Sequence, residues 1–295
     1  MPEPTWRGRS HGGGLGTALI TWVIRLGGRD LCYVILLGPS LWLWLRDRPA
    51  RRASLDYWRR LGARHPGWAS LRHFWTFART LADRVIAVQH PAALRYDQSG
   101  MEHLAAGLAH PGGRILLSAH LGSFELAARW VGERTGARLH LVMFDSEDPA
   151  VQAQLHRAMG DRPYQVIDLN DAEGAGFVIA SALGQGETCC MLGDRAAASQ
   201  AGNIVVPFLG GQAAFPSGPF IAAAATGAVI VPTFCVRTGW ATWRCEADQP
   251  FSVDLGPRPE RQARLRDYVA AWAARLEARV RRHPYGWNNY YDFWA

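Results

Sequence analysis

The chain has 295 residues, enough for one large domain or two small ones. With 48% hydrophobic and 19% charged residues it can bury a substantial core, which excludes a wholly disordered protein. The formal charge is +7, and all 32 basic residues are arginine. The exclusive use of arginine has two explanations. One is a genome rich in G and C. The other is contact with phosphate groups, because one guanidinium group can form two parallel hydrogen bonds to phosphate oxygens.

The N-terminal region contains two apolar stretches, residues 15–24 and 31–45, separated by two arginines and an aspartate. Each stretch is shorter than the roughly 20 residues that cross a bilayer, and no signal-peptide cleavage site follows. Short apolar helices flanked by arginine and tryptophan are typical of segments that lie in a membrane interface. We therefore predict that residues 1–48 form a helical membrane anchor. A helical hairpin buried beneath the main domain is the alternative.

The remaining residues, 49–295, are predicted to form one α/β domain. Residues 50–110 have the periodicity of helices rich in arginine and aromatic side chains. A basic aromatic helix suits an anionic membrane as well as nucleic acid, and no named nucleic-acid motif is present. We therefore expect a membrane surface and no nucleic acid among the partners.

From residue 113 onward, short apolar runs alternate with amphipathic segments. Strands are predicted at residues 113–119, 138–144, 164–169, 188–194, 203–209, 228–234 and 241–247. Helices are predicted at residues 122–135, 149–160, 173–184 and 259–282, and residues 215–227 are expected to be a loop that leads into a helix. This alternation predicts a mixed, largely parallel sheet flanked by helices.

The five cysteines form no C-x-x-C pair and no metal-ligand spacing. Their odd number favours reduced thiols over a disulfide framework. We expect neither a metal nor a cofactor.

The stretch LLSAHLGSFELAARW, residues 116–130, places His120 five positions before Glu125 at a junction of strand and helix. A glutamate in the first helical turn can reach back to an imidazole, fix its tautomer and stabilise the imidazolium. The other ring nitrogen would then be available to accept a proton. The alternative is structural, with Ser123 capping the helix and Glu125 complementing the helix dipole. The spacing alone leaves both interpretations open.

Several motifs in the same order carry a family resemblance. AHLGSFE resembles the H-x-x-x-x-D/E block of the lysophospholipid acyltransferase superfamily, in the form found in the bacterial lipid A late acyltransferases. MLGDRAAAS (191–199), VPFLGGQAAFPSGPFIAAAATGAVIVPTF (206–234) and HPYGWNNYYDFW (283–294) are similar to later blocks of that branch. One block departs from the pattern, because Gly-Asp-Arg stands where the lipid A enzymes usually have Asp-Gln-Asp. The acceptor is therefore open among lipid A precursors, lysophospholipids, amino-acid lipids and pigment lipids.

The resemblance implies a glycerolipid acyltransferase-like fold on the cytoplasmic face of a bacterial inner membrane. It implies transfer of a fatty or polyene acyl chain from acyl carrier protein or coenzyme A to a hydroxyl or amine of a lipid acceptor. His120 would be the general base, Glu125 would orient it, and no covalent intermediate would form. Expected substrate-binding residues are Gly122 and Ser123 as backbone oxyanion donors, Asp194 and Arg195 at a neighbouring strand end, and Gly218 and Pro232, which with Pro207 would shape the cleft.

Three other kinds of protein compete with this interpretation. A serine hydrolase needs a G-x-S-x-G elbow, which is absent around Ser118, Ser123 and Ser217. A thioesterase on the same fold would cleave the donor without an acceptor. A non-catalytic lipid-binding adaptor would explain the charge and the N-terminus, but it gives no reason for His120 and Glu125 to occur together.

Overall fold

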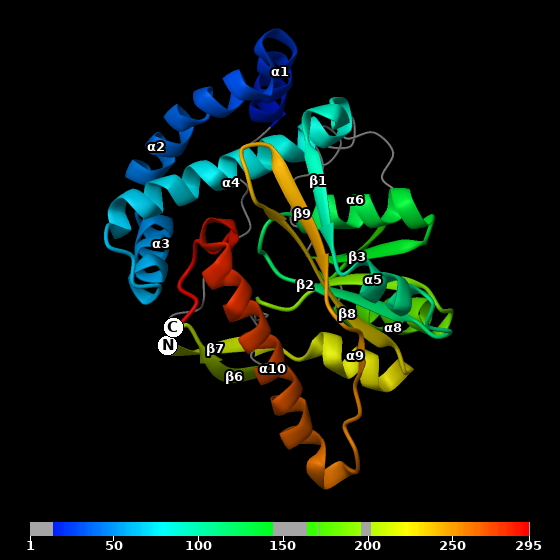
Figure 1. Cartoon of the computed structure of the whole chain (residues 1–295). Helices are drawn as coiled ribbons and strands as arrows, with labels where there is room; N and C mark the ends of the chain where they lie inside the picture. The colour runs from blue at the N-terminus through cyan, green and yellow to red at the C-terminus, as the bar shows by residue number, and fades with distance from the viewer. Residues whose placement is uncertain (1–13, 144–163, 171, 196–201, 295) are drawn as a thin grey trace.

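The computed structural model describes residues 14–143, 164–170, 172–195 and 202–294 (Figure 1). The helices in these residues are α1 (Gly14–Ile35), α2 (Leu37–Arg46), α3 (Arg48–Arg60), α4 (Pro66–Gln89), α5 (Met101–Leu108), α6 (Phe124–Thr135), α8 (Ala172–Gly184), α9 (Gly218–Thr226) and α10 (Arg261–Arg282). The helix predicted at residues 149–160 lies outside the described residues.

The strands build one large sheet and one hairpin. They are β1 (Arg95–Ser99), β2 (Arg114–Ser118), β3 (Leu139–Met143), β4 (Gln165–Asp168), β5 (Thr188–Leu192), β6 (Asn203–Phe208), β7 (Gly211–Pro216), β8 (Val229–Arg237), β9 (Thr242–Ala247) and β10 (Phe251–Ser252). The large sheet has the order β1-β9-β8-β2-β5-β3-β4, with β10 beside β8, and β6 pairs with β7. From β8 to β4 neighbouring strands are parallel, whereas β9 and β10 are antiparallel to β8. This confirms the predicted mixed, largely parallel sheet flanked by helices.

The sheet separates two hydrophobic layers because successive side chains of a strand point to opposite faces. In β2, Ile115 and Leu117 pack into the layer formed with α8, α9 and α10, while Leu116 packs into the layer formed with α4, α5 and α6. All three side chains are almost completely buried. The central strands are therefore covered on both faces, and their ends are left to carry polar side chains.

Three strands were not expected from the sequence: β1, β7 and the two-residue β10. β1 lies within residues 50–110, which had been interpreted as helical throughout, and β7 lies partly in the expected loop at 215–227. The β1 segment, Arg-Tyr-Asp-Gln-Ser, is polar and mostly exposed because it pairs only with β9 at the edge of the sheet. An edge strand of this kind lacks the apolar alternation by which strands are recognised.

Helices α1 and α2 lie at the periphery, with α4 between them and the sheet (Figure 1). Helix α1 kinks at Gly28, whose φ of 72° is outside the helical region. A single residue, Leu36, separates α1 from α2. Within the described part of the chain, no helix combines the length and the apolarity needed to cross a bilayer.

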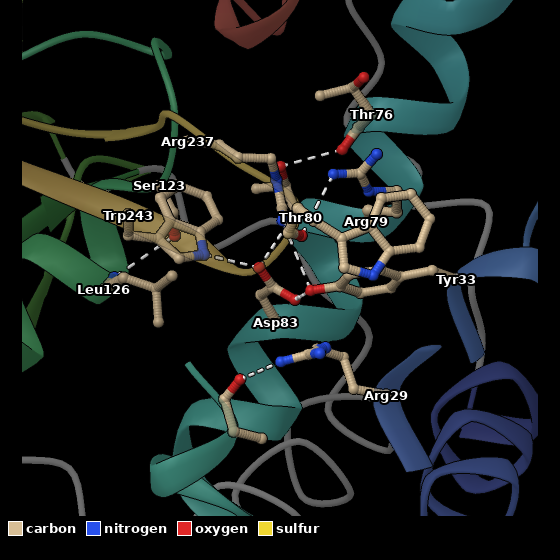
Figure 2. A network of polar contacts seen from close by, with 12 residues as sticks. Arg29, Tyr33, Thr76, Arg79, Thr80, Asp83, Ser123, Leu126, Arg237 and Trp243 are labelled. Carbon is tan, nitrogen blue, oxygen red and sulfur yellow. Dashed lines mark hydrogen bonds and ion pairs between the residues drawn. The ribbon is translucent and has the colours of Figure 1, made fainter. Parts of the chain in front are cut away.

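A buried polar network attaches α1 to the rest of the fold. Figure 2 shows side chains from three elements converging on Asp83 of α4. Tyr33 of α1 and Arg237 of β8 both bond to its carboxylate, and Trp243 of β9 donates its indole N–H over 2.6 Å. Asp83 is completely buried, so these donors replace the water that its charge would otherwise require. The peripheral helix α1 is thereby joined to the sheet through α4.

Candidate active site

The register of two central strands brings His120 and Asp194 together. In the parallel pair β2 and β5, Ser118 is opposite Leu192. His120 and Asp194 each follow two residues later, so both leave the carboxyl edge of the sheet side by side. This edge is where sites form in open α/β sheets.

Asp194 is the hydrogen-bond partner of the His120 ring. Nδ1 of His120 lies 2.8 Å from Oδ1 of Asp194, and the backbone N–H of His120 donates to Oδ2 over 3.0 Å. The indole N–H of Trp287 also donates to Oδ2, over 3.0 Å. Because the carboxylate accepts, the ring proton lies on Nδ1, and Nε2 presents its lone pair. The His120 side chain is 24% exposed, so this lone pair can be reached from outside.

The surroundings favour a neutral imidazole and an ionised carboxylate. Burial, and then the positive charge of Arg195, lower the pKa of His120, although Asp194 acts in the opposite direction. Burial alone would raise the pKa of Asp194, but the charge and hydrogen bond of His120, the charge of Arg195 and the bond from Trp287 together lower it. At neutral pH, His120 is therefore an unprotonated base held by a charged partner.

The expected contact of Glu125 with His120 does not form. Glu125 instead pairs with Arg84 of α4, and both side chains are largely buried. Ser123 caps α6 through a 3.3 Å bond from the N–H of Leu126, which places Glu125 in the first helical turn. From there its side chain extends toward α4, and Nδ1 of His120 is already occupied by Asp194. His120 and Glu125 thus belong to one motif but bond to different partners, Asp194 and Arg84.

The expected backbone oxyanion donors are also occupied. The N–H of Gly122 donates to the carbonyl of Gly286 over 2.7 Å, and the N–H of Ser123 donates to the carbonyl of Cys235 over 2.9 Å. Gly122 has a φ of 79°, and a Cβ at this position would lie 2.0 Å from the Cys235 carbonyl oxygen. A glycine is required here so that the turn after β2 can lie against β8.

The other predicted substrate-binding residues are distributed around this edge. Arg195 lies next to Asp194, and its guanidinium donates to the carbonyl of Asn288 over 2.8 Å. Gly218 is the first residue of α9, while Pro232 is buried within β8 opposite Leu117. Among the described contacts, neither Gly218 nor Pro232 is a hydrogen-bond partner of His120. Pro207, expected to help shape the cleft, lies in β6 opposite Gln212 of β7.

The sequence interpretation missed the part played by the C-terminal segment, residues 283–294. Trp287 donates to Asp194, and Asn288 donates its backbone N–H to the carbonyl of His120 over 2.8 Å and its side-chain N–H to that of Gly122 over 3.0 Å. The sequence carried two signals in HPYGWNNYYDFW, its similarity to a family block and its density of aromatic residues, and neither indicated a contact with the His120 turn. Aromatic density predicts burial but not the identity of the buried partner.

The chain matches the model of the bacterial lipid A biosynthesis acyltransferase family over residues 68–289. This span contains His120, Glu125, Asp194 and Trp287, and it covers most of the chain. The protein belongs to this family.

The chain has low sequence identity to the individual relatives that it matches. The chain is 25% identical over 200 residues to phosphatidylinositol mannoside acyltransferase of Mycobacterium tuberculosis, in strains H37Rv and CDC 1551. That match covers 66% of this chain and 58% of each relative, so the chain matches little more than half of their length. Among solved structures, the 1-acyl-sn-glycerophosphate (LPA) acyltransferase of Thermotoga maritima is similar with a TM-score of 0.41 and 12% identity, over 85% of this chain and 97% of that one.

Proposed function

We propose that this protein transfers an acyl chain from a thioester donor to a hydroxyl or amine of a lipid-type acceptor. The observation that carries the proposal is the His120–Asp194 pair, with Nε2 of the imidazole unbonded by the described residues and accessible from outside. Membership of a family of lipid acyltransferases supports the same chemistry. The proposal replaces the sequence-based dyad of His120 and Glu125 by one of His120 and Asp194.

The reaction follows from the tautomer. Nε2 of His120 takes the proton of the acceptor hydroxyl or amine as that atom attacks the thioester carbonyl. A C–O or C–N bond forms, the C–S bond breaks, and the proton held on Nε2 passes to the departing thiolate. Asp194 stabilises the transient imidazolium and prevents the ring from turning, which is the role of the acidic member of a catalytic triad.

Glu125 then acts indirectly. Its pair with Arg84 holds the first turn of α6 against α4, beside the turn that carries His120. The first backbone N–H groups of α6 have no acceptor within the helix, and they form its positive end. With Gly122 and Ser123 already engaged, we assign the stabilisation of the developing oxyanion to this helix end.

The donor class is either acyl carrier protein or coenzyme A, and Arg195 is the candidate for binding a donor or acceptor phosphate. For the acceptor, the related mycobacterial enzymes are named for a mannosylated phosphatidylinositol, a lipid with sugar hydroxyls. We propose an acceptor of this general kind, in which a hydroxyl or amine is carried by a membrane-anchored lipid.

We further propose that the protein works at the cytoplasmic face of the inner membrane, with α1 and α2 lying in the interface. Large apolar side chains are exposed on these helices, at Trp22, Leu31, Val34, Ile35, Leu37, Leu41, Trp42 and Leu45. At the end of α2 a shallow cavity of about 390 Å³ is lined by Trp42, Leu45, Arg46 and Arg48. Apolar side chains beside arginines match acyl chains beside anionic headgroups.

The decisive experiment compares purified wild type with His120→Ala, Asp194→Asn and Glu125→Gln. Lipids extracted from cells with and without the protein identify the acceptor by mass spectrometry, and transfer from palmitoyl-coenzyme A or palmitoyl-acyl carrier protein is then measured. His120→Ala should abolish transfer, Asp194→Asn should lower kcat about 10²–10⁴-fold, and Glu125→Gln should lower it less. Wild-type turnover in folded His120→Ala would refute the mechanism.

The same assay separates the competing classes of protein. An acyltransferase consumes the thioester only with acceptor, a thioesterase consumes it without acceptor, and an adaptor consumes none. Direct transfer also requires that no acyl-enzyme accumulates, so the mass of the intact chain should be unchanged after incubation with donor alone. An adduct of acyl mass on Ser123 or on any cysteine would contradict this step.

A further inference from the structure

The C-terminal segment clamps the turn that carries His120. Trp287 and Leu121 form an antiparallel bridge, flanked by the bonds from Gly122 to Gly286 and from Asn288 to His120. Both bonds are short, at 2.7 and 2.8 Å. The backbone on either side of the base is therefore fixed by residues more than 160 positions away in the chain.

The Trp287 side chain extends this clamp to Asp194. Its indole is completely buried, and its ring packs against Tyr57, Phe208 and Phe293 with centroids 4.9–5.3 Å apart. The ring has no room to turn, so its N–H stays directed at Oδ2 of Asp194. This leaves Oδ1 facing Nδ1 of His120.

His73 in turn holds the backbone of Trp287. Nε2 of His73 lies 2.8 Å from the Trp287 carbonyl, which can only accept, so the ring proton of His73 lies on Nε2. Nδ1 then accepts the hydroxyl of Ser54 of α3 over 3.1 Å. Burial lowers the pKa of His73 to about 4, so this ring is neutral at physiological pH. Both His73 and Ser54 are completely buried.

We propose that Trp287 is a positioning residue for the transfer reaction, and that His73 and Ser54 form its support. Hydrogen bonds join Ser54 to the His73 ring, that ring to the Trp287 carbonyl, the Trp287 indole to Asp194, and Asp194 to Nδ1 of His120. A carboxylate that accepts at both oxygens is fixed in rotation, so its charge stays aligned with the imidazolium as that charge develops. The proposal rests on the proposed function of His120 and adds residues outside the reacting centre.

The test uses Trp287→Phe with Trp243→Phe as its matched control. Both tryptophans are completely buried and donate their indole N–H to a buried aspartate, but Trp243 donates to Asp83. Phenylalanine keeps most of the ring and removes the donor. Trp287→Phe should lower kcat about 10–100-fold with little change in KM for donor or acceptor, whereas Trp243→Phe should lower only the melting temperature. Equal effects of the two variants on kcat would overturn the proposal.

A spectroscopic measurement tests the positioning without substrate. The Nδ1–H proton of His120, bonded to a buried carboxylate, should give a far-downfield ¹H NMR signal that is absent in His120→Ala. Trp287→Phe should shift or broaden this signal, and Trp243→Phe should leave it in place. An unshifted signal in folded Trp287→Phe would overturn the proposal even if transfer were impaired.

Variants of His73 provide a second route. His73→Phe removes the bond to the Trp287 carbonyl, while His73→Gln retains an N–H near the position of Nε2. Transfer should fall in His73→Phe and largely recover in His73→Gln. His140→Gln, a substitution of a buried histidine bonded to Glu187 at the other end of the strands, should not change kcat. Equal losses in His73→Phe and His73→Gln would contradict the proposed support.

The failures of the two proposals are distinguishable. If His120→Ala retains turnover, the proposed function of His120 fails. If His120→Ala is inactive while Trp287→Phe matches wild type in both kcat and the NMR signal, only the positioning role fails. A double mutant, Asp194→Asn with Trp287→Phe, should show little further loss beyond Asp194→Asn, because Trp287 acts through Asp194. Additive losses of kcat in the double mutant would contradict an action of Trp287 through Asp194.

Discussion

At the scale of single residues, burial and then the charge of Arg195 lower the pKa of His120, and this pKa limits the pH range in which the proposed base is unprotonated. The base must be unprotonated, so kcat/KM falls as the pH drops through the pKa of the coupled His120–Asp194 pair. Burial and the positive charge of Arg195 both lower the pKa of His120. The acid limb of the wild-type profile should therefore lie below the ordinary histidine value of about 6.5.

Replacing Arg195 by methionine removes the charge and retains most of the aliphatic stem. The pKa of His120 should rise, so the acid limb should move to higher pH and the variant should lose more activity at pH 6 than at pH 8. Arg138→Met is a suitable control, because Arg138 is exposed and lies just before β3, at the opposite end of the strand. An acid limb that stays in place or moves to lower pH would refute the role of this charge.

The sequence predicts His120 as the base, and this stays a prediction, but the structure places Asp194 rather than Glu125 against its ring. Spacing along the chain favoured Glu125, since both residues belong to one motif. The partner Asp194 is set by the register of β2 and β5, and this register pairs residues 74 positions apart in the chain. Asp194 was recognised as a residue at a strand end, but no local pattern specifies which side chain faces it.

At the scale of elements, the attachment of α1 depends on the carboxylate of Asp83. Tyr33, Arg237 and Trp243 reach it from three elements (Figure 2). Tyr33 and Trp243 are completely buried, and the Arg237 side chain is 7% exposed. Asp83→Asn would leave Arg237 with a buried charge and no anionic partner. Removing one member of a buried pair costs about 3–5 kcal/mol of unfolding free energy, which chemical denaturation can measure.

Two further variants make this stability prediction specific. Asp56→Asn removes one member of a half-exposed pair with Arg60, four residues later in α3, and should change the unfolding free energy by only about 0.5 kcal/mol. The double variant Asp83→Asn with Arg237→Gln should recover part of the loss, because the second substitution removes the stranded charge. A cost for Asp83→Asn no larger than that for Asp56→Asn would show that the network does not hold α1.

The elements themselves were largely predictable, because the central strands are buried on both faces and appear as continuous apolar runs. The sequence did not predict strand β1 or the path of the C-terminal segment. A polar edge strand has no apolar period, and the C-terminal segment owes its path to bonds with α4 and the turn after β2 rather than to any period of its own. Their structure comes from partners distant in the sequence.

At the scale of the whole molecule, the proposed membrane association rests on the exposed apolar face of α1 and α2 and on Arg46 and Arg48 at the junction of α2 and α3. Deleting residues 1–48 would remove this face, but it would also remove Tyr33 and expose the core that α1 covers. Substitutions at exposed positions are therefore the cleaner test. Trp42 and Leu45 are 59% and 56% exposed, so Trp42→Glu with Leu45→Glu should leave the fold unchanged.

We expect this double variant to bind vesicles containing phosphatidylglycerol at least about tenfold more weakly than wild type, because two apolar side chains no longer enter the bilayer and two negative charges repel its headgroups.

Arg46→Gln with Arg48→Gln should reduce only the preference for anionic over neutral vesicles, since those side chains supply charge and little apolar area. Phe177→Glu is the control, because Phe177 is 78% exposed on α8, which packs in the hydrophobic layer on the other face of the sheet from α1. Transfer to an acceptor embedded in vesicles should fall with binding, while transfer to a short-chain soluble acceptor should not. Wild-type vesicle binding by the double variant, or an equal loss in Phe177→Glu, would show that α1 and α2 are not the membrane-facing surface.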